Sequence, residues 1–452
     1  MKRDENGKII HRGILLIVFV VVLLAAGIAS GLLLPNPHRN EDPNATADIA
    51  SPPTNTATDT GPSATETPEP PPSKSTEPDD DQTPESDPPD SDTSDVPIDD
   101  DDEIPEVDPI EEKVAQIVAS MTLREKICQM LIVSPDAITG VQGTTIPGSI
   151  TKKSVERYPV GGFIQSTQNI KDGAQILKFN TTVQTFSKIP LFIGVDEEGG
   201  RVGRLKSTLE AHTINAMMTY ADDGETVAFE NAKTLAGALK KYGFNLDFAP
   251  VADVLSNPEN TVIGDRAYST NFDTAALLVA SAVNGFHSEN IVCTLKHFPG
   301  HGSTQEDSHT SVTYVNRTLD ELNENEFKPF AAGIIEGADF VMVGHLIVPS
   351  IDELPASLSR TLITDILRGE LGFNGVVITD SLSMSSITSQ FNSQQVAVTA
   401  IQAGVDILLM PSDIDATITA IITAIENDEI TVSRINESVS RIIRAKVEAG
   451  IV

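Results

Sequence analysis

From about residue 109 onward, short apolar runs alternate with longer amphipathic stretches, and this alternation constrains the fold more than any other feature of the chain. Eight runs have the length and the Val, Ile, Leu and Phe content of buried strands. They span residues 129–133, 161–164, 191–196, 246–251, 292–297, 340–345, 376–380 and 407–411. The clearest helical stretches span residues 169–187, 230–242, 273–288, 320–336, 361–371, 394–403, 413–426 and 432–449. Buried strands that alternate with helices form βαβ units, and these units build a parallel sheet.

Eight such units predict an α/β fold, a closed (β/α)8 barrel of the TIM type. An open doubly wound sheet is the alternative, but residues 199–203 (GGRVG) match its dinucleotide fingerprint only in part. In a barrel the active site lies at the carboxyl ends of the strands. Five of the runs end in, or closely precede, a polar or ionisable residue: Asp196, Asp253, His297, His345 and Asp380. Because a charge at a buried edge is costly, five such residues on one face indicate a functional site.

The beginning of the chain has a different character. Residues 14–34 contain no charged side chain and are long enough to cross a bilayer core as a helix. Four basic residues precede them, and no lysine follows until Lys74, so residues 1–13 are expected to stay in the cytoplasm. Residues 14–34 are therefore predicted to be a single-pass transmembrane signal anchor in the cell membrane, with the rest of the chain extracytoplasmic. A cleaved signal peptide, with a small-residue site at residues 27–29, would instead give a secreted protein.

Residues 35–108 are rich in Pro, Thr, Asp and Glu and contain few large apolar side chains. Between Glu41 and Asp108 the sequence has 22 acidic residues and one basic residue, so this segment contributes −21 to the net charge of −34. Such a segment cannot bury enough apolar surface to offset its ordering entropy, and its charges repel one another. We expect a disordered tether between the anchor and a folded domain at residues 109–452. The acidity also argues against nucleic acid as a partner.

The chain has two cysteines, Cys128 and Cys293, and both lie in apolar runs. A chain that can bury a large core does not need a disulfide framework. The sequence therefore predicts two buried free thiols.

Three of the eight histidines fall in KHFPGHGSTQEDSH, residues 296–309. His297 and His301 have the spacing of helical zinc ligands, but the Pro-Gly between them excludes a helix, so metal binding is the weaker interpretation. Asp307 and His309 point the same way if the loop is extended. A carboxylate beside an imidazole supports its protonated form and suits a general acid/base. From the triplet alone, a hydrogen-bonded turn that happens to contain a histidine is the stronger interpretation.

Three further motifs place charged residues after predicted strands. VVITDSLSM, residues 376–384, presents Asp380, which could act as a nucleophile or could only cap the next helix. GVDEEGGRVGRL, residues 194–205, combines Asp196 with Arg201 and Arg204 on a Gly-rich loop. These side chains could bind a hydroxyl-rich ligand. Alternatively, an Arg–Asp pair could only stiffen the loop. Residues 245–269 carry Asp253 and Arg266 around another loop.

Together these four motifs resemble glycoside hydrolase family 3, in particular its β-N-acetylhexosaminidase branch, the NagZ-like enzymes. The resemblance covers about residues 110–450. It implies that Asp380 is the catalytic nucleophile and that His309, with Asp307, is the general acid/base. It also implies a set of positions that hold the sugar: Asp196, Arg204, Arg266, Lys296, His297 and Met384. Two departures, Ser303 and Ser381, stand where the family often has acids.

The resemblance implies a carbohydrate substrate, no cofactor or metal, and retaining hydrolysis of terminal β-linked GlcNAc from cell-wall fragments or GlcNAc oligosaccharides. A β-glucosidase is one alternative, although such relatives usually draw the acid/base from a second domain, for which the sequence after the last helix leaves no room. A β-N-acetylglucosaminide phosphorylase and a non-catalytic, surface sugar-binding barrel are the others. No obligate protein partner is evident from the sequence, and His301 has no predicted catalytic role.

Overall fold

The computed structural model describes residues 108–205, 214–305, 307–308 and 311–452. All eight predicted strands form within these residues, most of them shorter than the predicted runs. They are β1 (Leu131–Val133), β2 (Gly162–Ile164), β3 (Phe192–Val195), β6 (Leu246–Asp247), β7 (Thr294–Phe298), β9 (Phe340–Val343), β12 (Val376–Thr379) and β13 (Leu408–Leu409). At the carboxyl ends of five runs, residues 196, 248–250, 344–345, 380 and 410–411 lie in the loops that follow the strands.

The eight strands close into a parallel ring. Five of them pair in the order β13-β1-β2-β3-β6 and three in the order β12-β9-β7. Parallel bridges join the two sheets, between Val251 and Lys296 on one side and between Ile378 and Ile407 on the other. The predicted barrel is therefore confirmed, and the open sheet is wrong.

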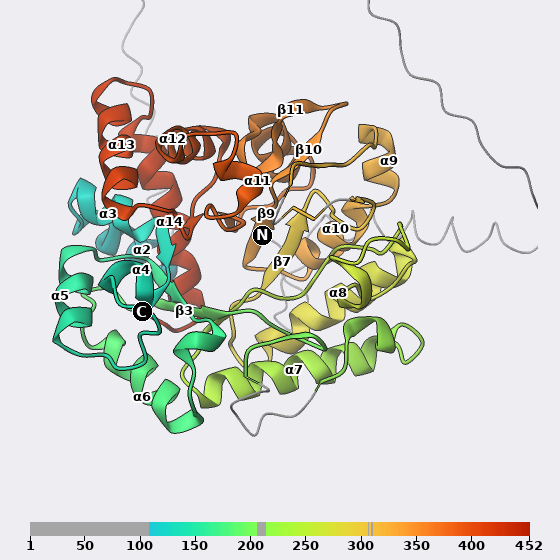
Figure 1. Cartoon of the computed structure of the whole chain (residues 1–452), viewed down its shortest axis with the longest axis horizontal. Helices are drawn as coiled ribbons and strands as arrows, with labels where there is room; N and C mark the ends of the chain where they lie inside the picture. The colour runs from blue at the N-terminus through green and yellow to red at the C-terminus, as the bar shows by residue number, and fades with distance from the viewer. Residues whose placement is uncertain (1–107, 206–213, 306, 309–310) are drawn as a thin grey trace, which may run out of the picture. The chain divides into compact units, whose positions relative to one another are not determined.

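Helices surround the strands, and in Figure 1 they follow the ring in chain order from α5 and α6 through α7, α8 and α10 to α12 and α13. The helices are α2 (Pro109–Ala119), α3 (Leu123–Gln129), α4 (Pro135–Thr139), α5 (Ser149–Arg157), α6 (Gly173–Gln184), α7 (Glu225–Lys241), α8 (Phe272–His287), α9 (Leu319–Glu324), α10 (Phe327–Ile335), η5 (Thr361–Glu370), α11 (Ser385–Thr388), α12 (Ser393–Ala403), α13 (Ile414–Glu426) and α14 (Val432–Glu448). A capping box formed by Thr122 and Glu125 begins α3.

Two of the predicted helices differ in detail. The stretch 320–336 divides into α9 and α10 at Asn325, whose side chain donates a hydrogen bond to the Glu321 carbonyl at 2.9 Å. Such a local bond competes with continuation of the helix. The stretch 361–371 winds as a π-helix, in which the Leu371 amide donates to the Ile366 carbonyl five residues back.

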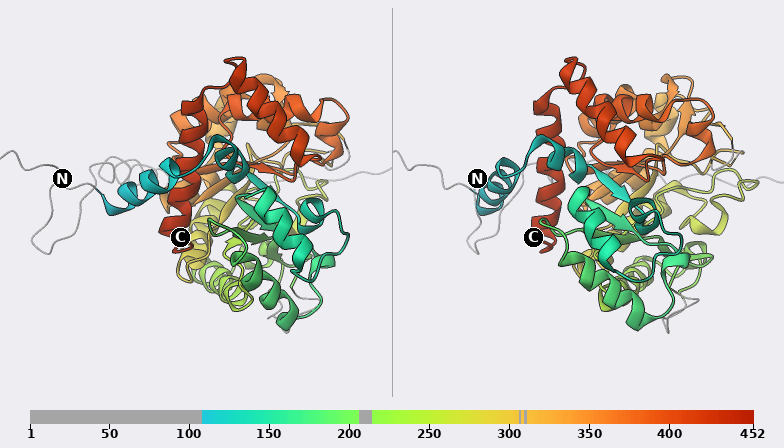
Figure 2. Two further views of the ribbon diagram at one scale, coloured as in Figure 1. Left: turned by 90° about the vertical axis from the view of Figure 1, so that its left-hand side faces the viewer. Right: turned by 60° about the vertical axis from the view of Figure 1, so that its left-hand side comes forward.

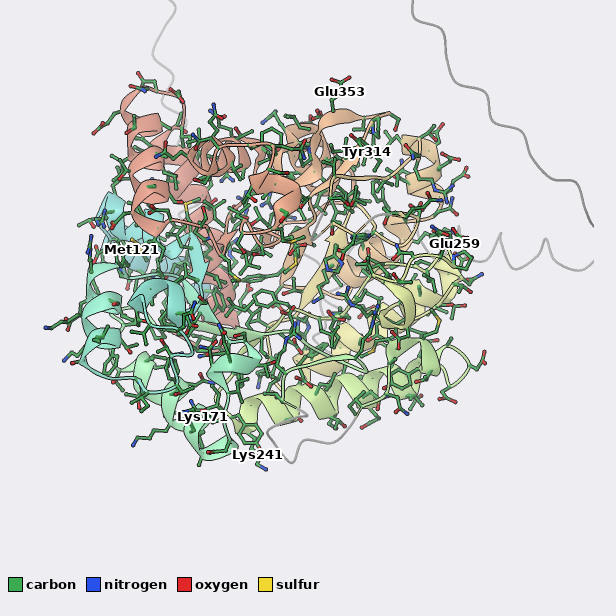
Figure 3. All side chains as sticks on the ribbon, in the orientation of Figure 1. Met121, Lys171, Lys241, Glu259, Tyr314 and Glu353 are labelled. Carbon is green, nitrogen blue, oxygen red and sulfur yellow. The ribbon has the colours of Figure 1, made fainter. Side chains whose placement is uncertain are left out.

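Short additional strands stand on the loops at the carboxyl ends of the barrel. β4 (Glu197–Gly199) and β5 (Val202–Gly203) form an antiparallel pair directly after β3. β8 (Thr313–Tyr314), β10 (Leu346–Val348) and β11 (Asp352–Pro355) form a second small sheet. Figure 3 shows Tyr314 and Glu353 of this second sheet at the same edge of the molecule.

Aromatic side chains pack inside the ring. Phe192 of β3 and Phe340 of β9 meet edge to face, with ring centroids 5.2 Å apart, and both are fully buried. Each buried phenylalanine stabilises the fold by roughly 1.5–3 kcal/mol. Both predicted free thiols, Cys128 and Cys293, are confirmed as unpaired and buried.

The two ends of the described domain lie together, and Figure 2 shows α2 beside the long helix α14. The Lys113 ammonium donates to the Val452 carbonyl at 2.8 Å, and Arg444 forms an ion pair with Glu111 at 2.6 Å. These contacts join the start of the domain to its last helix.

The predicted anchor at residues 14–34 and all of the predicted linker at 35–108 except Asp108 lie outside the described residues. Within the part of the chain that the structure describes, no helix combines the length and the apolar character that a membrane span requires.

Candidate active site

A cavity of about 420 Å³ opens at the carboxyl ends of the barrel strands. Its lining comes from several strand ends and from the β4–β5 loop, as the prediction of a site on this face requires. Among its lining residues are Asp196, Glu198, Arg204, Arg266, Lys296, His297, Asp380, Ser381 and Met384. The structure thus brings Asp380 together with all six predicted sugar-holding residues.

A charged network forms one wall of this pocket. The Lys296 ammonium lies 2.9 Å from an Asp196 carboxylate oxygen and 2.6 Å from Glu198. Arg266 donates two hydrogen bonds to Glu198, at 2.8 and 2.9 Å, in the paired geometry that guanidinium and carboxylate groups favour. Four charges are therefore held in place before any ligand binds.

The charges of this network are coupled. Burial alone would raise the pKa of the Glu198 carboxyl, but Lys296 and Arg266 outweigh it and hold the pKa well below its ordinary value. Burial alone would lower the pKa of Lys296, and the carboxylates of Asp196 and Glu198 raise it instead. Lys296 is therefore a cation and Glu198 an anion at neutral pH.

Sequence reasoning missed Glu198. It stands two residues after Asp196 in the DEEGG loop, and residues i and i+2 of an extended segment point the same way. That periodicity could have placed Glu198 in the pocket with Asp196.

The two arginines of the Gly-rich loop differ. Arg204 lies 3.8 Å from Asp196, at the pocket. Arg201 instead donates to the carbonyls of residues 261–263 and forms an ion pair with Asp265 at 3.0 Å. Arg201 therefore stiffens the loop, while Arg204 remains in reach of a ligand.

Asp253 is buried beneath the site and acts on the loop after β7. One carboxylate oxygen contacts the His297 Nδ1 at 2.7 Å, and the other accepts the His301 amide at 2.6 Å. Burial opposes ionisation, but the histidines outweigh it and lower the pKa of Asp253. Asp253 therefore orients His297 and does not itself line the pocket.

Asp380 directly follows β12, and its amide donates to the Val343 carbonyl of β9 at 2.9 Å. The next helix, α11, has Met384 as its N-cap, so Asp380 does not cap it. His345, which follows β9, lies 3.0 Å from the Ser381 carbonyl through Nε2 and 2.8 Å from the Ser357 hydroxyl through Nδ1. These contacts hold the turn that presents Asp380 to the pocket.

The predicted acid/base loop is described only in part. His309 lies outside the described residues, so its pairing with Asp307 stays a prediction. His301 lies within them, and its ring contacts the Ser308 hydroxyl and the Thr304 hydroxyl, each at 2.8 Å. Burial lowers the pKa of His301, so the ring is neutral near pH 7. His301, for which the sequence suggested no catalytic role, fastens the loop one residue before His309.

The sequence profile of the glycosyl hydrolase family 3 N-terminal domain matches residues 122–445, which include all barrel strands and the whole pocket. The chain belongs to glycosyl hydrolase family 3. Beta-hexosaminidase A of Pseudoalteromonas piscicida, a relative, is 33% identical over 336 residues, which are 68% of this chain and 56% of that protein. The beta-hexosaminidase of Idiomarina loihiensis is 36% identical over 267 residues, 58% of this chain and 79% of that one.

Among solved structures, a family 3 β-N-acetylglucosaminidase from Paenibacillus sp. str. FPU-7 superimposes with a TM-score of 0.68 at 33% identity. The matched region covers 74% of this chain and 63% of that one. The chain therefore spans less than two thirds of the length of this family 3 enzyme and of the Pseudoalteromonas relative.

Proposed function

We propose that this family 3 chain is a retaining exo-β-N-acetylglucosaminidase that releases terminal β-linked GlcNAc. The observation that carries the proposal is the pocket in which Asp380 lines the same cavity as the Lys296–Asp196–Glu198–Arg266 network. Fixed charged donors and acceptors suit the hydroxyl groups of a sugar ring. The relatives whose names specify a hexosaminidase or a β-N-acetylglucosaminidase support GlcNAc as the sugar.

In the first step, an Asp380 carboxylate oxygen attacks the anomeric carbon as the bond to the leaving oxygen breaks. His309, supported by Asp307, donates a proton to that oxygen. The product is a covalent glycosyl-aspartate ester with inverted configuration.

In the second step, water attacks the anomeric carbon and releases Asp380. His309, now neutral, accepts the proton from the water, and the second inversion restores the original configuration. An imidazole thus takes the place of the second carboxylate that most retaining glycosidases use. Every step uses groups of this chain and water.

The remaining pocket residues would position the sugar. Lys296, Asp196 and Arg204 supply donors and acceptors for hydroxyl groups, and His297 stands beside them on β7. Glu198 keeps Lys296 and Arg266 charged and fixed, which lowers the reorganisation needed in the transition state. Met384, nearly buried at the pocket wall, offers an apolar contact for the ring.

The central test measures hydrolysis of an aryl β-N-acetylglucosaminide by the purified chain and by Asp380→Ala. We expect Asp380→Ala to lower kcat by roughly four orders of magnitude or more, because it removes the nucleophile. Parallel reactions with and without phosphate separate hydrolysis from phosphorolysis, and an aryl β-glucoside tests the glucosidase alternative. If wild type and Asp380→Ala are equally inactive while sugar still binds, the protein is a binding barrel.

The acid role of His309 has its own test. His309→Ala should retain most activity on an aryl substrate with a good leaving group, since such a group needs little protonation, and should lose far more on a disaccharide. Equal losses on both substrates would contradict the acid role.

The natural substrate and the location form the finer part of the proposal. If residues 14–34 anchor the chain with its barrel outside the membrane, cell-wall fragments are the expected substrates. Comparing GlcNAc–MurNAc fragments with chitobiose tests that choice, and the fractionation of the full-length chain with membranes tests the anchor.

A further inference from the structure

A second cluster of reactive side chains lies at the opposite end of the barrel from the sugar pocket. His287 ends α8, Cys293 directly precedes β7, and Asp339 directly precedes β9, so all three stand at the amino-terminal ends of the strands. One ligand-type atom of each, a ring nitrogen, a thiol sulfur and a carboxylate oxygen, lies within 4.8 Å of the other two. Neither the family resemblance nor the proposed reaction uses this cluster.

The spacing approaches that of a tetrahedral metal site. His287 Nε2 lies 2.9 Å from Asp339 Oδ2 and 3.8 Å from Cys293 Sγ. Tetrahedral zinc, with bonds of about 2.0 Å to nitrogen and oxygen and about 2.3 Å to sulfur, places such atoms about 3.3–3.5 Å apart. Changes of about half an ångström in these two distances would bring them to the tetrahedral values.

The backbone already holds two of the three groups together. The Cys293 amide donates to Asp339 Oδ2 at 2.9 Å, and the Phe340 amide donates to the Cys293 carbonyl at 3.1 Å. Cys293 is fully buried, whereas His287 and Asp339 are partly exposed, with 33% and 18% of their side-chain surfaces accessible. A cation could therefore reach the site from solvent and be held against the core.

Asp339 is the anionic group that would attract a cation to this cluster. Among the described residues, Asp339 forms an ion pair with His287 and with no lysine or arginine. A cavity of about 300 Å³ beside Asp339 is also lined by Glu448 and offers room for water. Arg441 and Arg444 line it too; Arg444 is paired with Glu111, and Arg441 shares the Asp406 carboxylate with Arg368 and Arg434.

We propose that His287 Nε2, Cys293 Sγ and Asp339 Oδ2 bind one divalent zinc-type cation, with water from the cavity as the fourth ligand. Binding displaces the thiol proton of Cys293 to solvent and requires His287 to be neutral, with its remaining proton on Nδ1. The two anionic ligands balance the charge of the cation. The bound ion links the end of α8 to the residues that precede β7 and β9. It would therefore stabilise the barrel at the end opposite the sugar pocket.

Cobalt reports directly on the thiolate ligand. Adding Co²⁺ to the metal-stripped full-length chain should produce a thiolate-to-cobalt charge-transfer band in the near ultraviolet that saturates at one equivalent. Cys293→Ser should abolish the band, and Cys128→Ser, which changes the other buried thiol, should retain it. Absence of the band in wild type, its survival in Cys293→Ser, or its loss in a folded Cys128→Ser would each overturn the proposal.

A second measurement uses a substitution at the partly exposed His287 in place of the buried Cys293. Zn²⁺ should raise the Tm of the metal-stripped wild type, because a ligand that binds only the folded state stabilises it. His287→Gln, at a partly exposed position, should lower Zn²⁺ affinity at least tenfold and remove that rise, while its activity on an aryl β-N-acetylglucosaminide stays that of wild type. An equal rise in Tm for both proteins would refute the site, whatever the outcome of the glycosidase assays.

Discussion

Two lysines are buried inside the same barrel, at opposite ends, and their surroundings differ in kind. Lys296, at the pocket, lies 2.9 Å from Asp196 and 2.6 Å from Glu198. Lys446 of α14 is fully buried near the amino-terminal end, where its ammonium group donates to the Gln129 side-chain oxygen at 2.8 Å and lies 5.0 Å from the centre of the Phe192 ring. Among the described residues, Lys446 has no ion-pair partner.

The difference shows that partners, more than depth, decide the charge of a buried lysine. At Lys296 two carboxylates outweigh burial and raise the pKa, whereas burial lowers the pKa of Lys446 to about 7. One amide oxygen and an aromatic face cannot replace a carboxylate. The end of the barrel that would bind sugar thus keeps a fixed cation, and the other end holds an amine that is readily neutralised.

The largest effect should follow from Lys296→Met. This substitution removes the closest cation of Asp196 and leaves Arg266 as the one remaining ion-pair partner of Glu198 among the described residues. Glu198 is buried, and Asp196 is partly buried beside it. Removing one partner of a buried pair typically costs about 3–5 kcal/mol of unfolding free energy, and we expect glycosidase activity to be lost as well. Urea denaturation and aryl-glycoside hydrolysis measure both effects, with Lys171→Met on the surface as the control (Figure 3). Wild-type stability in Lys296→Met would contradict the network.

Glu198→Gln should act mainly on activity. The amide keeps the shape of the side chain but removes the charge that fixes Lys296 and Arg266, so the pocket loses part of its alignment. We expect kcat/KM to fall about a hundredfold, the scale of a small misplacement in an active site. Glu259→Gln, at the exposed position labelled in Figure 3, is the matched control. A Glu198→Gln enzyme as active as that control would show that the network does not serve the reaction.

Lys446→Met should stabilise the protein near neutral pH. The ordinary lysine pKa of 10.5 applies to the unfolded chain and about 7 to the folded one, so unfolding takes up a proton between these values. Lys446 therefore makes wild-type stability rise with pH from about 7 towards 10, and the variant should lack this rise. The gain should be about 3–4 kcal/mol at pH 7 and should shrink towards zero near pH 10. Parallel pH profiles of unfolding free energy for the two proteins would be evidence against a neutralised lysine.

Gln129→Glu should change the unfolding free energy least. It tests most directly whether a carboxylate partner accounts for the different pKa values of the two buried lysines. It supplies Lys446 with a carboxylate and thereby imitates the surroundings of Lys296, but it also removes the amide that donates to the Pro159 and Val160 carbonyls. The two changes oppose each other, so we expect a net change of about 1 kcal/mol or less at pH 7. The informative readout is the rise in stability between pH 7 and 10, which should shrink as the pKa of Lys446 increases. A rise of wild-type size would show that Gln129 does not control that pKa.

The barrel was predictable because its signal is local. Each of the eight strands is a short buried run with breakers around it, and burial on both faces can be seen within five or six residues. The position of the site residues at the carboxyl edge of the barrel was predictable for the same reason, because each of them directly follows or ends a buried apolar run. Asp196, Lys296, His297 and Asp380 meet in one pocket as that argument requires.

Other features depend on side-chain choices that the residue pattern does not reveal. Asn325 ends a helix by bonding to its own turn, although the residues around it continue the helical pattern. The sequence placed Asp253 in a loop at the site. In the structure Asp253 is buried beneath the pocket, where it contacts His297 Nδ1 and accepts a hydrogen bond from the His301 amide. Glu198 was not predicted because Asp196, and not Glu198, ends the predicted strand run.

The sequence by itself determined the eight-fold alternation and the edge of the barrel at which polar residues such as Asp380 gather, and both rest on periodicity and order along the chain. The role of Asp380 as the candidate nucleophile came from the resemblance of its motif to glycoside hydrolase family 3. Only the tertiary structure decided which charges are paired. Lys446 and Gln129 are 317 residues apart in the chain, and Arg266 and Glu198 are 68 apart. Because the energy of a buried charge depends on groups within a few ångströms in space, the two lysines acquire opposite properties only when the barrel closes.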